Sequence, residues 1–320
     1  MVESGSLEVD GIRIALDDAS SEVCFVSHAH SDHTEAFSKK RAIIASDETF
    51  VLMGKEPSCH PLLSSLRLHP AGHMLGARQL RAETPDGTFV YTGDFSLNCS
   101  YTAPAAEILQ CDTLMIDSTY CLPNMRFPPR EKVLSDMRRF VRGNEREIIV
   151  FGAYVRGKSQ ELVRFLNAEC GLSPVVSAKA ARVCEAYGRC GVKLDYVAAG
   201  TSEAEEAMRH PFVAIMPPRA VNFRFGSLLS EAFGHGAKTA VATGWAALWR
   251  FPVDAAFPLS DHADFRDTMR YIYESGAKKV ICANSGTAQA AGYLRSIGID
   301  AAEKGGPAQQ AQKTLAQCES

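Results

Sequence analysis

The chain has 320 residues, of which 46% are hydrophobic and 22% are charged, so it can form one large domain or two modest ones with a full core. Its formal net charge of −3 excludes a general attraction to polyanions, and a nucleic-acid partner would require a local basic groove. The chain lacks an apolar run of about eighteen residues, a signal-like N-terminus and CxxC spacing among its ten cysteines, which predicts a cytoplasmic protein with reduced thiols and no membrane partner.

The first third of the chain is predicted to form short strands separated by turns. Apolar or alternating runs bounded by turn residues favour strands at 12–16, 23–27, 42–45, 66–69, 79–83, 88–91 and 114–116. Near Pro129 the period changes, and Val133, Met137 and Val141 mark one face of a helix.

Strands and helices then alternate through the middle of the chain. We expect strands at 148–151, 175–177 and 212–216 and helices at 159–167 and 179–188. This alternation predicts α/β layering with a parallel sheet. A helix at 265–274, a strand at 279–283 and a helix at 287–296 follow, and Gly276 and Gly298 are stop signals for the two helices.

The segment from His28 to His33 (HAHSDH) carries the clearest chemical signal, directly after the predicted strand 23–27. Three imidazoles and one carboxylate this close together are unfavourable without a cation, because the imidazoles repel when protonated and compete for partners when neutral. Zn²⁺ binds neutral imidazole nitrogens and carboxylate oxygens. The segment therefore predicts ligands for two adjacent metal positions.

Two later residues complete the predicted set of ligands. His73 lies in a glycine-flanked loop and Asp94 follows a predicted strand. Each is weak evidence alone, since a loop histidine is usually solvated and a Gly-Asp pair is usually a turn. In order, they give His28, His30 and His73 for one metal, Asp32 and His33 for a second, and Asp94 as a bridge. Asp17 or Asp18 is expected to support these ligands by hydrogen bonding.

The order of HxHxDH, His73 and Asp94 resembles the metallo-β-lactamase fold. The segments IDSTY (116–120) and LSDHAD (259–264) resemble motifs A and B of the β-CASP nuclease group, which bracket an inserted domain. Further segments, including YVRGKSQ (154–160) and TGW (243–245), are similar to the prokaryotic ligase-associated DNA exonucleases and mRNA 3′-end processing factor-like proteins. This likeness covers nearly the whole chain.

The resemblance implies an αββα sandwich interrupted by an inserted α/β β-CASP domain. Since the candidate catalytic residues lie in the first and last thirds, we expect the metallo-β-lactamase domain at 1–125 and 245–305, the insert at 126–244 and a tail at 306–320. It also implies catalytic roles for Asp32, Asp117 and His262, with His262 assisting the leaving oxygen and Asp117 orienting it.

Asn284 departs from the family pattern, because motif C usually has a histidine at this position. An asparagine carbonyl is a harder and weaker ligand than imidazole, so we expect one tightly bound Zn²⁺ and a second site that Mn²⁺ or Mg²⁺ can occupy.

Substrate contacts are expected at two places. The helix start formed by Arg156, Gly157, Lys158 and Ser159 could cradle a phosphate with its free N–H groups and two cations, although an exposed helix start is nearly as good an explanation. Ser118 and Thr119 follow Asp117 in motif A and are expected beside the substrate.

These features predict a metal-dependent exonuclease acting on single-stranded DNA in repair or processing, with a DNA ligase or helicase as the partner that the resemblance implies. A β-CASP ribonuclease and a non-catalytic nucleic-acid-binding subunit stay open as alternatives. A secreted lactamase, a glyoxalase-like thioesterase and a tRNA 3′-processing enzyme fit less well.

Overall fold

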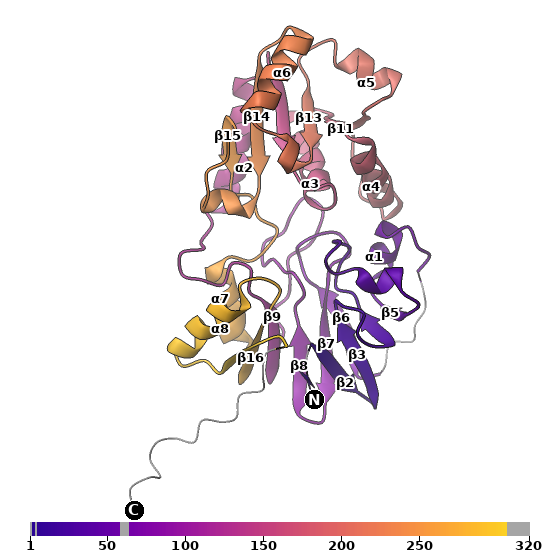
Figure 1. The fold of residues 1–320 in the computed structure, drawn as a ribbon, viewed down its shortest axis with the longest axis vertical. Coiled ribbons are helices and arrows are strands. Elements are labelled where there is room, and N and C mark those ends of the chain that lie inside the picture. The colour runs from indigo at the N-terminus through magenta and orange to yellow at the C-terminus, as the bar shows by residue number, and fades with distance from the viewer. Residues whose placement is uncertain (1, 4, 58–63, 306–320) are drawn as a thin grey trace, which may run out of the picture.

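The computed structural model describes residues 2–3, 5–57 and 64–305, and shows two lobes along the long axis of the molecule (Figure 1). The lower lobe contains the early and late parts of this range, and the upper lobe contains its middle. No helix in the described part is long and apolar enough to cross a membrane.

Two sheets packed face to face form the lower lobe. The first has the order β1 (Val2–Glu3), β2 (Ser6–Val9), β3 (Ile12–Leu16), β4 (Val23–Phe25) and β5 (Ala42–Ile44). The second has the order β17 (Ala301–Glu303), β16 (Lys279–Ala283), β9 (Thr113–Asp117), β8 (Gly87–Tyr91), β7 (Arg78–Thr84) and β6 (Leu66–Pro70). Buried Phe25, Leu80 and Tyr91 belong to the core between the sheets, which holds the two faces together.

Helices cover the outer faces of this sandwich. Against the larger sheet lie α7 (Phe265–Ser275) and α8 (Thr287–Ser296), which bury Tyr271 and Leu294 against its apolar side chains. The short helix η1 (Glu35–Ser38) covers part of the smaller sheet. The nearby helix α1 (Asp47–Leu52) begins at Ser46, whose hydroxyl caps it.

The upper lobe has its own six-stranded sheet, and all its strand pairs are parallel. The order is β12 (Val197–Ala198), β11 (Val175–Val176), β13 (Val213–Met216), β10 (Ile148–Gly152), β14 (Ala237–Ala242) and β15 (Ala255–Phe257). All five residues of β10 are buried, because a central parallel strand is covered on both faces.

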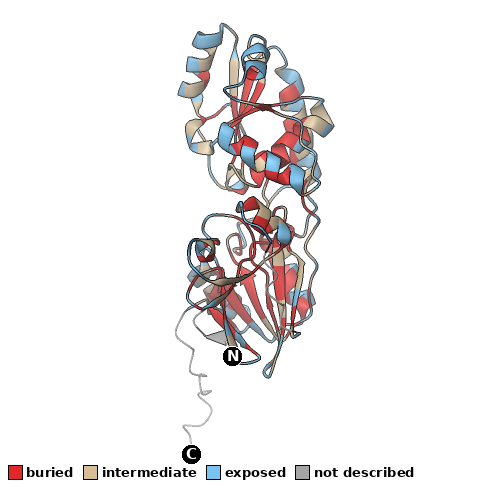
Figure 2. Cartoon of the chain, turned by 90° about the vertical axis from the view of Figure 1, so that its right-hand side faces the viewer, coloured by how far each residue is buried: buried red, intermediate tan, exposed pale blue. Residues whose placement is uncertain are grey.

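Helices cover both faces of this sheet, and Figure 2 shows its strands buried between them. One apolar cluster contains residues of α2 (Arg130–Gly143), α3 (Lys158–Phe165) and α4 (Ala178–Arg189), with the π-helical turn η2 (Leu166–Cys170) after α3. The other contains residues of α5 (Ser202–Ala207) and α6 (Phe223–Phe233). Short helices η3 (Pro218–Ala220) and η4 (Gly244–Ala247) follow β13 and β14.

The structure is a mixed α/β protein with several sheets, which confirms that part of the predicted fold class. The upper sheet continues through β15 to Phe257, past residue 244 where we expected the insert to end. The difference arises because the Ala-Ala-Phe segment of β15 is too short to give a strand signal of its own.

Candidate metal centre

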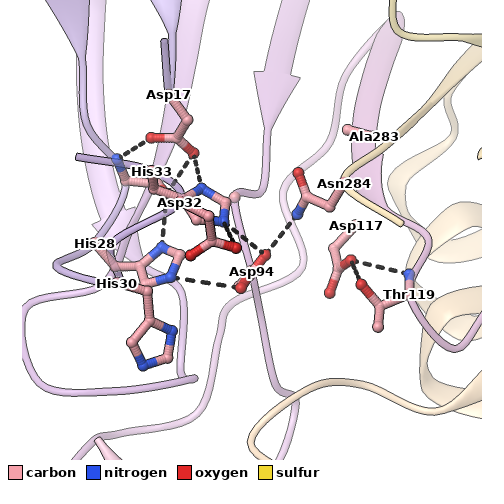
Figure 3. A network of polar contacts seen from close by, with 12 residues as sticks. Asp17, His28, His30, Asp32, His33, Asp94, Asp117, Thr119, Ala283 and Asn284 are labelled. Carbon is pink, nitrogen blue, oxygen red and sulfur yellow. Dashed lines mark hydrogen bonds and ion pairs between the residues drawn. The ribbon is translucent and has the colours of Figure 1, made fainter. Parts of the chain in front are cut away.

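The predicted ligands lie where strands of the lower lobe end, facing the upper lobe. Strands β8, β9 and β16 are parallel neighbours, so their carboxyl ends meet at one edge of the sheet. Asp94 follows β8, Asp117 ends β9, and Asn284 follows β16, while the HAHSDH segment follows β4 and His73 follows β6. Figure 3 shows the labelled members of this group facing one another.

Four of the predicted ligands form a tight set. His28, His30, His73 and Asp94 each offer an atom, and these atoms all lie within 4.8 Å of one another. Asp94 Oδ2 lies 3.4 Å from His28 Nε2 and 3.5 Å from His73 Nε2, and His73 Nε2 lies 3.1 Å from His30 Nδ1. Ligands bound at about 2.0–2.2 Å to one tetrahedral Zn²⁺ are separated by roughly 3–4 Å, so the set fits a zinc ion.

In His30 and His73, the ring nitrogen that faces away from the four-ligand set forms a hydrogen bond with a backbone carbonyl oxygen. His30 Nε2 lies 3.1 Å from the carbonyl oxygen of Arg156, and His73 Nδ1 lies 3.1 Å from that of Asp261. A carbonyl oxygen can only accept, so these outer nitrogens carry the proton and the inner ones keep their lone pairs. His28 Nε2 is buried and makes no hydrogen bond with any described residue, which leaves it available to a metal.

Asp17 supports two of the histidines from one buried carboxylate. Its Oδ2 accepts from His33 Nδ1 at 2.8 Å, from the Tyr91 hydroxyl at 2.8 Å and from the Ser27 hydroxyl at 2.6 Å. Because the Ser27 hydroxyl donates its hydrogen bond to Asp17, the Ser27 oxygen accepts from His28 Nδ1 at 2.9 Å. Of the two candidates Asp17 and Asp18, the structure therefore assigns the supporting position to Asp17.

The electrostatics of the three grouped histidines suit a cation. Burial, with the neighbouring imidazoles, holds the pKa of His28 and His73 well below the usual range. Burial likewise lowers the pKa of His30 to about 4. Before a metal binds, all three rings are therefore neutral near neutral pH, the form that coordinates Zn²⁺.

The second predicted set is looser. His33 Nε2 lies 3.7 Å from both Asp32 Oδ2 and Asp94 Oδ1, and the Asp32 side chain is 78% exposed. Burial acts to lower the pKa of His33, but the Asp17 carboxylate raises it to about 10. Among the described residues, Asp32, His33 and Asp94 do not form a group as tight as the first.

Our expectation for Asn284 is wrong in one respect. We expected either its carbonyl oxygen or a water molecule to complete the second metal site, but its Nδ2 donates to Asp94 Oδ1 at 2.5 Å. An amide N–H cannot coordinate a cation, so Asn284 orients the shared carboxylate and is not itself a ligand in this arrangement.

Unusual backbone geometry is concentrated at this site. Of the four described residues other than glycine with positive φ, three are Asp17 (59°), His73 (46°) and Asn284 (69°). Such conformations cost free energy and persist where the surroundings impose them, often at functional sites. Beside His73, a Cβ at Gly72 would overlap the Ser96 carbonyl, so only glycine fits this turn.

His262 and Asp117 form a second pair beside the first set. His262 Nδ1 lies 2.7 Å from Asp117 Oδ2, and Asp117 Oδ1 accepts from the Thr119 amide and hydroxyl. Burial acts to lower the pKa of His262, but Asp94 and Asp117 raise it to about 9, so the ring is protonated at neutral pH. Because Asp264 caps α7, His262 has no capping role.

The predicted phosphate cradle at the start of α3 is closed. The Gly157 amide donates to the Gln160 side chain, and the Ser159 amide and hydroxyl donate to the Tyr154 carbonyl. These groups are therefore not available to a phosphate, and our expectation for Gly157 and Ser159 is wrong, because partners inside the protein already satisfy them.

The two cations of that segment also have internal partners. The Arg156 guanidinium donates to carbonyl oxygens of Ala29 and Leu52. The buried Lys158 ammonium pairs with Glu161 at 2.7 Å and with Asp261. Both side chains join the upper lobe to loops of the metal centre, which makes them structural links and not an open anion site.

The two residues that follow Asp117 in motif A have different surroundings. The buried Ser118 hydroxyl donates to the carbonyl oxygens of Ala283 and Ser285, so it fixes the end of β16 and is closed to substrate. Thr119 lines the cavity and donates to Asp117, and its contact with substrate stays a prediction.

A cavity of about 1160 Å³ opens above the metal centre, between the lobes. Helix α4 contributes three basic side chains to its wall, Lys179, Arg182 and Arg189, which we did not predict as functional. Neither Lys179 nor Arg182 forms an ion pair with any residue in the described ranges. Their spacing on the predicted helix 179–188 was the available signal, since residues three apart share a helix face.

No protein-family model matches the chain. A probable DNA ligase of Opitutus terrae is 31% identical over 299 residues, which is 87% of this chain and 28% of that protein. The 5′ exonuclease Apollo of Gallus gallus is 26% identical over 78% of this chain and 55% of its own length. The cleavage and polyadenylation specificity factor subunit 3-II of Arabidopsis thaliana is 32% identical over 32% of this chain and 17% of its own.

The chain thus spans from about a quarter to just over half of the length of the first relatives that it matches. A crystal structure of a protein of unknown function from Enterococcus faecalis shares the fold, with a TM-score of 0.57 at 14% identity over 87% of this chain and 78% of that one. These relatives confirm the predicted resemblance to the β-CASP nucleases of the metallo-β-lactamase fold.

Proposed function

We propose that this protein is a metal-dependent exonuclease that hydrolyses phosphodiester bonds in single-stranded DNA. One observation carries the proposal: His30, His73 and Asp94 of the first set line one cavity together with His262, which Asp117 holds. The first group fits a metal and the second fits a proton donor, which are the two kinds of group that phosphodiester hydrolysis requires.

The three neutral histidines and Asp94 would hold a zinc ion, which supplies Lewis-acid activation of water and neutralises charge on the phosphate. His262 Nε2 lies 3.8 Å from Asp94 Oδ2 and so faces the same space. From there His262 donates its proton to the leaving oxygen, while Asp117 holds the ring in position and keeps it charged.

A second, weaker cation would lie at His33, Asp32 and Asp94, where Mn²⁺ or Mg²⁺ competes better because two of the three ligands are carboxylates. Asp32 then contributes to catalysis by holding that cation. Its exposed side chain must move or order on binding, which favours low affinity.

DNA is the substrate that we favour, because a probable DNA ligase matches over 87% of this chain and a 5′ exonuclease matches over 78% of it. The first match also supports a DNA ligase as a partner in processing strand ends. Because the net charge is −3, binding of nucleic acid requires a local basic groove, and the cationic side chains of α4 supply it. We assign the upper lobe as the β-CASP insert that closes this groove.

The test is digestion by purified, metal-loaded protein of single-stranded DNA and RNA of the same sequence, each labelled at the 5′ or the 3′ end. We expect DNA to be shortened progressively from one end and a circular single strand to resist. His30→Ala protein prepared in parallel controls for contaminating nucleases.

A ribonuclease is the second candidate, and the similarity to a cleavage and polyadenylation specificity factor subunit favours it. Turnover of RNA alone in the same assay would establish that function in place of ours. Binding of both strands without cleavage, at any divalent metal concentration, would instead indicate a non-catalytic subunit.

A further inference from the structure

Three aromatic rings form a continuous row that begins at His262 and ends in solvent. The Tyr120 ring lies 5.8 Å from the His262 ring and 4.8 Å from the Trp245 ring. Trp245 in turn stacks on Trp249 with centroids 4.6 Å apart and planes 9° apart. Tyr120 is buried and Trp245 partly buried, whereas Trp249 is 61% exposed.

The row is held in place by its backbone. Thr243 caps the short helix η4, and the amide of Trp249 donates to the carbonyl of Trp245, so the two indoles lie one helical turn apart. A Cβ at Gly244 would lie 2.8 Å from the Tyr120 hydroxyl, so this loop packs directly on Tyr120. The rings are therefore fixed relative to the metal centre before any ligand arrives.

The surroundings of the row match a single nucleic-acid strand. Trp245 and Tyr120 line the same cavity as the metal centre, and so do the cationic Lys179 and Arg182 of α4. An exposed indole beside a cavity with unpaired cations is the combination that binds unpaired bases by stacking and phosphates by charge. An apolar partner would leave the cations unpaired, and an acidic partner without flat rings would pair with the cations but would not stack on the indoles.

We infer that Tyr120, Trp245 and Trp249 form a base-stacking platform that receives unpaired nucleobases of the strand next to the scissile bond. This rests on the proposed function, and specifies how that site selects single strands. The three ring-to-ring steps place Trp249 within about two to five nucleotides of the reaction centre. A base inside a duplex is stacked between its neighbours and cannot offer its face to Trp249, so duplex DNA is excluded there.

The chain has only two tryptophans, Trp245 and Trp249, so its tryptophan fluorescence reports on the platform alone. The probe is a thymidine oligomer of about twelve nucleotides, titrated into metal-loaded His262→Ala protein, in which cleavage is slow. We expect quenching of the emission on saturation. Trp249→Ala should weaken binding by on the order of tenfold, and Trp249→Phe by less.

An abasic site moved along the oligomer locates the contact. We expect one position within about five nucleotides of the cleaved bond to weaken binding as much as Trp249→Ala does, and to cause no further loss in that variant. Tyr273→Ala is the matched control, because Tyr273 is an exposed aromatic on α7 that is not part of the cavity wall. This variant should bind as the parent protein does.

Tryptophan emission that stays unchanged at saturating oligomer would overturn the platform. So would additivity, in which the abasic site weakens the binding of Trp249→Ala protein as much as it weakens that of the parent protein. The proposed function fails separately: an oligomer that quenches the emission but is never cut by the unmodified protein supports the platform and removes the nuclease. Cleavage without quenching leaves the nuclease and removes the platform.

Discussion

The two sides of the metal centre share Asp94 but are built differently. On one side His28 and His73 are buried and His30 is half-buried, and all three are neutral and oriented by acceptors on their outer nitrogens. On the other side His33 is held by Asp17, while Asp32 is exposed.

The difference teaches that enclosure and pre-organisation, and not only the identity of the ligands, separate a tight site from a weak one. The enclosed side has paid the cost of ordering its ligands on folding, whereas Asp32 must be ordered when a metal binds. We therefore expect one resident metal and one exchangeable metal in each chain.

The largest effect is expected on the enclosed side. His30→Ala removes one of the four ligands of the first set, so tight metal binding and hydrolysis should both fall below detection. Metal content by elemental analysis after dialysis, together with DNA digestion, measures both. His210→Ala, an exposed histidine outside the site, is the control. Full activity of metal-free His30→Ala protein would sink the nuclease proposal.

His262→Ala tests the proton donor that lies beside the enclosed set without belonging to it. Turnover should fall by roughly 10²–10⁴-fold, the range for a positioned acid. Metal content should stay unchanged, because the four ligands of the first set are intact. If metal content collapses with turnover, His262 is a structural support of the first set and not an acid.

Asp17→Asn weakens the support behind both sides at once. The Asp17 carboxylate accepts with both oxygens, from the Ser27 amide at Oδ1 and from His33, Ser27 and Tyr91 at Oδ2, whereas an uncharged amide has one accepting oxygen and would turn an N–H toward one of these sets of donors. We expect metal affinity to fall by roughly 10–100-fold in competition with a chelator, the usual cost of losing such a partner. Asp18→Asn is the matched control, since Asp18 accepts a local hydrogen bond from the Ser20 amide and does not contact the metal ligands in the described part of the chain. Equal affinities in the two variants would show that Asp17 does not tune the site.

Much of this centre could be predicted because its ligands are contiguous or follow strand ends. Strand β16 and helix α8 have the predicted bounds, since glycines and polar residues punctuate the sequence around them. Strand β14 was not predicted, because its Ala-Lys-Thr-Ala-Val-Ala sequence has little strand propensity and is stabilised by neighbours on both sides.

The closed start of α3 could not be predicted for another reason. The Arg156 and Lys158 side chains are satisfied by Ala29 and Asp261, each more than a hundred positions away in sequence. Local sequence showed a glycine and two cations at a helix start but not their partners. The position of Asp17 behind His33 likewise depends on tertiary packing, so the sequence left Asp17 and Asp18 as alternatives.

The smallest effect, and the most direct test of the comparison, is expected at Asn284. Its N–H holds Asp94 but contributes no ligand, so the open side lacks the donor that a histidine would add. Asn284→His should lower the Mn²⁺ concentration needed for half-maximal activity by about an order of magnitude, the scale of other changes around metal ligands. The left-handed backbone at φ 69° accepts histidine more readily than most residues.

Asn284→Ala separates the two contributions, because it removes the hydrogen bond to Asp94 without adding a nitrogen donor. That variant should need at least as much Mn²⁺ as the unmodified protein, while Asn284→His needs less, as measured by titrating metal against activity in all three proteins. Two tightly bound metals per chain in the unmodified protein after dialysis would contradict the comparison, because the open side would then be as strong as the enclosed one.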